Sequence, residues 1–117
     1  MIRLHGIPNC DTVKRARAWL NGQGRPHEFI DFKKSPPEEA QLRRWSEALG
    51  GVDGLVNRRG TTWRQLDDTQ RAAADGAEGA LALLQLKPSL IKRPVVDWPD
   101  GRVTTGFDPT AWQERLG

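Results

Sequence analysis

The chain has 117 residues, 37% hydrophobic and 28% charged, with a formal net charge of +3. This balance is typical of a single soluble globular domain and argues against a disordered chain. Acidic residues are interspersed among the basic ones, so the charge indicates a small anionic ligand rather than a continuous nucleic-acid footprint.

Cys10 is the only cysteine, so the chain cannot form an internal disulfide, and no His/Cys spacing resembles a zinc site. We therefore expect no metal and no tightly bound cofactor. The start of the chain has no apolar run of signal-peptide length, and no segment approaches the roughly 20 apolar residues that cross a bilayer. These features predict a cytoplasmic protein with no membrane partner.

The first third of the chain alternates strand and helix. Residues 2–7 interleave apolar and polar side chains and predict a short strand. Asn9 is a good N-cap for the helix that an apolar stripe then predicts, and residues 21–24 close that helix. Residues 27–32 are rich in β-forming side chains and predict a second strand.

The middle of the chain is predicted to be mostly helical. One helix opens at residues 35–39, with proline in the first turn and acidic residues near its positive end, and runs to about Leu49. Shorter helical patterns follow at 63–66, 69–74 and 77–86. We therefore expect a helical insertion over about residues 38–87.

The last part of the chain predicts two strands and a helix. Residues 90–97 form a β-prone run, and Asp100-Gly101 predicts a two-residue hairpin turn into a strand over 102–105. A final helix is expected over about 109–116, with Asp108 as its N-cap.

A βαβ start and a ββα end are the thioredoxin arrangement. We therefore predict an α/β, thioredoxin-like (glutaredoxin-like) fold with a mixed four-stranded sheet and a helical insertion, in one domain over residues 1–117.

Cys10 falls at the start of the first predicted helix. Unsatisfied backbone N–H groups and the helix dipole favour an anion there, which lowers the pKa of a thiol and makes it nucleophilic. The alternative is an inert cysteine packed as a small hydrophobic residue. Val13 stands where a Cys-x-x-Cys pair would have its second cysteine, so a redox-active Cys10 needs an external resolving thiol, for which glutathione is the natural small molecule.

Two arginine segments are candidates for binding an anion. In a thioredoxin-like sheet a proline at position 94 would face the cysteine, and Arg93 would present its side chain to the site; the alternative is a trans proline at a strand start with Arg93 in solvent. Residues 57–60 place paired arginines in a loop that can hold an oxyanion or a carboxylate, or simply be a solvated basic loop. His5 and His27 alternate with apolar residues and are interpreted as structural.

Together these segments resemble the arsenate reductase (ArsC)/Spx family of thioredoxin-fold proteins, and are most similar to its YffB subgroup. Residues 7–17, 58–66, 88–96 and 101–103 carry the resemblance. It implies that Cys10 is the catalytic nucleophile, that Arg93 precedes a cis proline at Pro94, and that Arg58 is a further anion-binding residue.

The resemblance also implies an oxidoreductase that uses glutathione as co-substrate, with glutaredoxin as a further partner, and that reduces a small thiol, disulfide or oxyanion substrate. Glutathione-dependent arsenate reductases carry a third arginine that should fall near Gly106, where this chain has none. A thiol or disulfide is therefore a more attractive substrate than arsenate.

Two alternatives stay open. One is an Spx-like regulator that binds RNA polymerase, although such regulators usually carry the Cys-x-x-Cys pair that Val13 interrupts. The other is a family member that binds glutathione without turnover.

Overall fold

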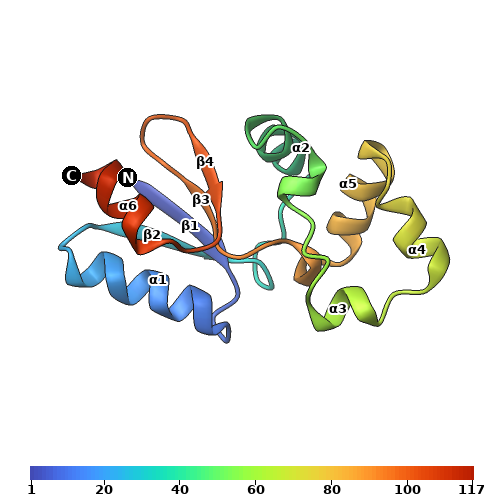
Figure 1. The fold of residues 1–117 in the computed structure, drawn as a ribbon, viewed down its shortest axis with the longest axis horizontal. Helices are drawn as coiled ribbons and strands as arrows, with labels where there is room; N and C mark the ends of the chain where they lie inside the picture. Colours follow the sequence, from blue (N-terminus) through green and yellow to red (C-terminus); the bar gives the residue numbers. More distant parts are fainter. The chain divides into compact units, whose positions relative to one another are not determined.

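The computed structural model describes residues 1–117 and divides them into two compact units (Figure 1). The first comprises residues 1–31 and 93–117, and the second comprises residues 32–92. No helix in either unit combines the length and apolar character that crossing a membrane requires.

The first unit is built on one four-stranded sheet. Its strands are β1 (Ile2–Gly6), β2 (His27–Asp31), β3 (Val95–Asp97) and β4 (Val103–Thr105), in the spatial order β2-β1-β3-β4. β1 pairs with β2 in parallel, whereas β3 runs antiparallel to both β1 and β4. The mixed sheet, with helices α1 (Asp11–Gly22) and α6 (Pro109–Leu116), confirms the predicted α/β class.

The core of this unit comes from the apolar stripe of α1 and the sheet. Val13, Ala16 and Leu20 are fully buried in the same cluster as Leu4 of β1. Truncating a buried leucine of this kind costs about 2–5 kcal/mol. The predicted helical stripe is therefore the face that anchors α1 to the sheet.

Aromatic rings fix α6 in the same core. The indole of Trp112 lies edge-on to that of Trp98, with ring centroids 5.1 Å apart, and to the ring of Phe107, with centroids 4.8 Å apart. The ring of Trp19 in α1 also lies edge-on to that of Trp112, with ring centroids 5.9 Å apart. Asp108 caps α6 by accepting hydrogen bonds from the N–H groups of Thr110 and Ala111, as predicted.

Two expectations for the C-terminal hairpin were wrong. The strand expected from residue 90 begins only at Val95, because residues 90 and 91 pair elsewhere, in a bridge between Ile91 and Val56. The hairpin loop has three residues rather than two, since Trp98 closes it by hydrogen bonding to Arg102 O at 2.9 Å. Gly101 takes φ +87° at the end of this loop, the left-handed position that glycine accepts readily.

The second unit is helical. It contains α2 (Glu39–Ala48), α3 (Thr61–Arg64), α4 (Asp68–Ala73) and α5 (Ala77–Leu86), with short 3-10 turns at Val52–Gly54 and Pro88–Leu90. The predicted insertion, about 38–87, lies within it. Its fully buried side chains include Leu42, Trp45, Leu55 and Leu84.

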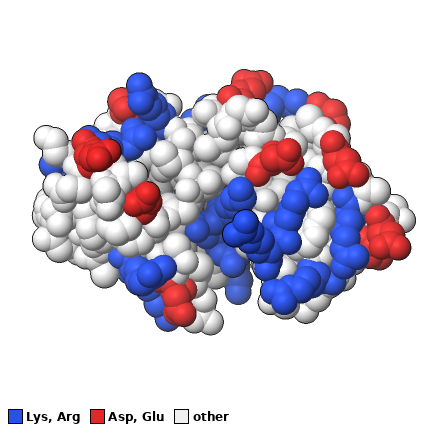
Figure 2. Space-filling model, viewed as in Figure 1, with Lys and Arg blue, Asp and Glu red and all other residues white.

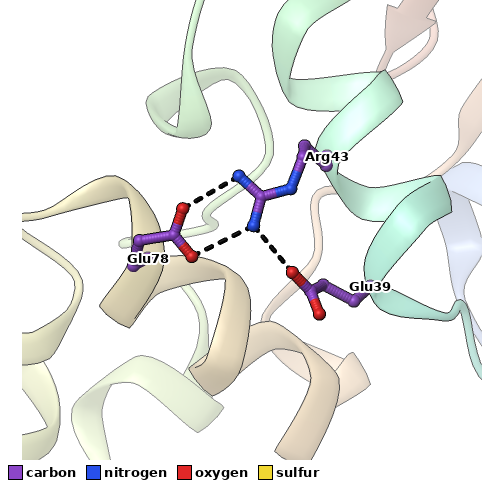
Figure 3. Close-up of polar contacts among 3 residues, drawn as sticks. All are labelled: Glu39, Arg43 and Glu78. Carbon is purple, nitrogen blue, oxygen red and sulfur yellow. Dashed lines mark hydrogen bonds and ion pairs between the residues drawn. The ribbon is translucent and has the colours of Figure 1, made fainter.

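A cluster of three charged side chains joins α2 to α5 on the surface of this unit (Figure 3). The guanidinium of Arg43 donates to both carboxylate oxygens of Glu78, at 2.9 and 3.0 Å, and to Oε1 of Glu39 at 2.7 Å. The positive charge of Arg43 lowers the pKa of Glu78. Because these groups are exposed to solvent, their attraction is screened by salt.

Candidate active site around Cys10

Cys10 is itself the N-cap of α1. Its backbone is extended, with φ −125° and ψ 123°, and its carbonyl accepts the first helical hydrogen bond from Lys14 N at 2.9 Å. The expectation that Asn9 is the N-cap was therefore wrong by one residue. The shift places the thiol directly at the positive end of the helix, where an acceptor is favoured.

Three influences set the protonation of the Cys10 thiol. Burial raises its pKa, but hydrogen bonding from the Val13 N–H and from the Arg93 side chain, together with the positive charge of Arg93, lowers it. The N–H of Thr12 adds a smaller contribution in the same direction. The net effect is a pKa below the ordinary value of a cysteine, in a side chain that is still partly exposed. A lowered pKa favours the thiolate, which is the nucleophilic form of a cysteine.

The segment that carries Arg93 comes from the far end of the chain. The Arg93–Pro94 peptide bond is cis, so the trans alternative is wrong. Pro94 is buried, and its carbonyl accepts a hydrogen bond from Gly106 N at 2.9 Å. The start of β3 is thus tied to the end of β4, and this fixed edge holds Arg93 within hydrogen-bonding reach of the sulfur.

The resemblance to glutathione-dependent arsenate reductases predicts a third arginine near Gly106, where this chain has none. The φ of Gly106 is +80°, and a Cβ built there would meet no atom within 4 Å. A larger side chain would therefore have room, but it would have to adopt a left-handed backbone that glycine accepts at little cost.

Sequence reasoning did not identify Gly6 as part of the site. A Cβ at Gly6 would lie 2.8 Å from Cγ2 of Val13, so the missing side chain lets α1 approach β1 closely. Val13 is fully buried in this contact. The position of a second cysteine is thus filled by core packing, and the only signal in the sequence was a glycine just before the predicted turn.

Arg58 lies in the second unit, whereas Cys10, Arg93 and Pro94 lie together in the first. Its guanidinium is held by Asp53 Oδ1 at 3.2 Å and by the carbonyl of Ala74 at 3.3 Å, and it stacks on the Trp63 ring at 4.8 Å. Figure 2 shows other Lys and Arg side chains gathered over the α3 part of this unit. Arg58 is therefore a fixed part of a basic surface rather than a freely solvated side chain.

His5 is a structural residue, as expected from its alternation with apolar neighbours. It is 4% exposed, and its Nε2 lies 3.0 Å from Oδ2 of Asp97 on the neighbouring strand β3. This contact joins two central strands of the sheet.

The chain matches the ArsC family over residues 5–115. It is similar to a solved protein called YffB, with 40% identity, full coverage of both chains and a TM-score of 0.91. It is also similar to an arsenate reductase (ArsC) related protein from Brucella melitensis, with 36% identity, a TM-score of 0.76, and coverage of 98% of this chain and 93% of that one. The global transcriptional regulator Spx of Listeria innocua is 25% identical over 99 residues, which are 82% of this chain and 72% of Spx.

Proposed function

Because this chain belongs to the ArsC family, we propose that it is a glutathione-dependent reductase in which Cys10 is the single nucleophile. The observation that carries the proposal is the place of Cys10 at the N-cap of α1 beside Arg93, where its pKa is lowered. The lack of a second cysteine supports glutathione as the external resolving thiol. A cytoplasmic setting, which is reducing, suits this chemistry.

The proposed reaction has two thiol–disulfide exchanges. The Cys10 thiolate first attacks the glutathione sulfur of a mixed disulfide between glutathione and a substrate thiol. The new S–S bond forms on Cys10, the old one breaks, and the substrate leaves as a thiolate that takes up a proton. The thiolate of a second glutathione then attacks the glutathione sulfur on Cys10, which releases glutathione disulfide and restores the Cys10 thiolate. The substrate is reduced and glutathione is oxidised.

A disulfide substrate is favoured over arsenate by the surroundings of the thiol. Arg93 is the cation that lowers the pKa of Cys10, and it is the proposed anion-binding group of the first unit. Gly106 leaves no third arginine at the end of β4. An arsenate oxyanion and its thiol adduct carry more negative charge than a disulfide does, so they gain more from additional cations.

The proposal is tested by replacing the nucleophile. Cys10→Ser is expected to abolish glutathione-dependent reduction of a glutathionylated peptide and to form no glutathione adduct, measured by a coupled assay and by mass spectrometry. Wild-type protein is expected to form the adduct and to release it when glutathione is added. Arsenate assayed beside the peptide is expected to be the poorer substrate.

A Cys10→Ser variant that keeps full glutathione-dependent reductase activity would overturn the proposal. An adduct that forms on wild-type protein but is never released by glutathione would indicate the non-catalytic alternative. Stable capture of the RNA polymerase α subunit by a protein whose Cys10 does not react would instead indicate an Spx-like module.

A further inference from the structure

The second unit has an open pocket of about 420 Å³, a volume in the range of small-molecule sites. Its framework is an antiparallel bridge between Val56 and Ile91, extended by hydrogen bonds from Asn57 N to Leu90 O at 2.8 Å and from Lys92 N to Leu55 O at 2.7 Å. The bridge places Asn57 and Lys92 in the same lining.

The loop after this bridge is shaped by one asparagine. Oδ1 of Asn57 accepts a hydrogen bond from the backbone N–H of Arg59 at 3.1 Å, a turn that orders the start of the basic loop. A Cβ on Gly60 would lie 2.9 Å from Nδ2 of Asn57, so a larger residue at position 60 would force the end of the Asn57 side chain to shift. The Asn57 side chain therefore holds the segment that carries Arg58 and Arg59 in a defined conformation.

The charges that line the pocket fall into two groups. Arg58 and Asp53 are paired with each other, and Arg58 also donates a hydrogen bond to the carbonyl of Ala74, the residue before Asp75. The side chains of Arg59, Lys92 and Asp75 also line the pocket, but none of them makes a hydrogen bond or ion pair within the protein. Two unpaired positive charges and one unpaired negative charge thus face the same hollow.

An occupant that carries only negative charge would be repelled by Asp75, and one that carries only positive charge would be repelled by Arg59 and Lys92. A ligand with a carboxylate and an ammonium group satisfies all three side chains. We propose that this pocket binds the α-amino-acid group of a small molecule, with Arg59 and Lys92 on its carboxylate and Asp75 on its ammonium group. The proposal concerns a different unit from Cys10 and does not depend on the reductase activity.

The test uses the full chain with Cys10→Ser, so that no thiol chemistry contributes. Backbone amide shifts are followed by NMR while L-glutamate, N-acetyl-L-glutamate or inorganic phosphate is added. We expect saturable shifts at Asn57, Arg59 and Lys92 with L-glutamate. N-acetyl-L-glutamate lacks the ammonium group, and we expect it to bind about tenfold more weakly, the effect of losing one charge-assisted hydrogen bond.

Two variants separate the two ends of the ligand. Asp75→Asn is expected to weaken the binding of L-glutamate by about tenfold and to strengthen that of N-acetyl-L-glutamate, which no longer faces the negative charge of Asp75, whereas Lys92→Gln weakens the binding of both. Glu47→Gln, an exposed change on α2 outside the pocket lining, is the matched control and should alter neither.

Absence of shifts in the pocket with L-glutamate would overturn the proposal. Equal affinity for L-glutamate, N-acetyl-L-glutamate and phosphate would also overturn it, because the pocket would then be a simple anion site. Neither result would bear on the proposed reductase, which is measured separately through Cys10.

Discussion

The two units use arginine in opposite ways. In the first, the Arg93 side chain lies against a thiol that can ionise, and its positive charge favours the thiolate. In the second, Arg58 is held by a carboxylate, a backbone carbonyl and an aromatic ring, so its charge is largely committed. The contrast shows that the role of an arginine depends on its partners. An arginine beside an ionisable group changes the pKa of that group, whereas an arginine held by fixed partners supports the structure.

The largest expected effect tests whether the helical unit is as tightly packed as the sheet unit. A Cβ on Gly79 of α5 would lie against the carbonyl of Ala73 at the end of α4. Gly79→Ala is therefore expected to lower the free energy of unfolding by about 3 kcal/mol, measured by urea denaturation. Gly76→Ala, which meets no atom within 4 Å, is the control. An equal free energy of unfolding for Gly79→Ala and Gly76→Ala would show that α4 and α5 move apart at little cost to make room for the added methyl group.

The second prediction compares the two arginines directly through the thiol. Arg93→Gln removes the charge and the hydrogen bond that lower the pKa of Cys10, so the pKa should rise. Alkylation by iodoacetamide near pH 7 is then expected to slow by about tenfold, with the midpoint of its pH profile moved to higher pH, since only the thiolate reacts. Arg58→Gln should leave the profile unchanged. A profile that Arg93→Gln does not move would remove Arg93 from the site.

The third prediction concerns the end of β4. Because Gly106 has φ +80° and open space around it, Gly106→Arg should fold but lose about 1 kcal/mol of stability, measured by thermal unfolding. Gly106→Asn should lose less, because asparagine tolerates the left-handed region better than other residues do. A Gly106→Arg chain as stable as wild type would mean that this backbone is relaxed when an arginine is present.

The smallest effect is expected at the ion pair between α2 and α5. Arg43→Gln removes the contacts from the half-buried Arg43 to the exposed carboxylates of Glu78 and Glu39. We expect a small drop in Tm at low salt that disappears at high salt, because screening already weakens the pair. A large drop that salt does not change would indicate that Arg43 also packs against the helices through its alkyl chain.

Elements with a complete local signal were predicted closely from the sequence. The last helix runs over Pro109–Leu116 with Asp108 as its cap, because the capping aspartate and the proline of the first turn are adjacent in the chain. The strand expected from residue 90 was too long, since residues 90 and 91 pair with the segment around Val56, far away in the chain. Strand propensity does not reveal such a partner.

The sequence by itself determined that a lone cysteine stands at a helix start with no resolving partner, because helix signals and residue identity are local. Only the tertiary structure decided that Cys10 is the N-cap and that Arg93 lowers its pKa, while Arg58 is tied to Asp53 and Ala74. These pairings depend on strand order and on the packing of distant segments. The pKa of a thiol depends on the charges and N–H groups that surround it in space. The residues next to the cysteine in the sequence do not determine which of these groups come close.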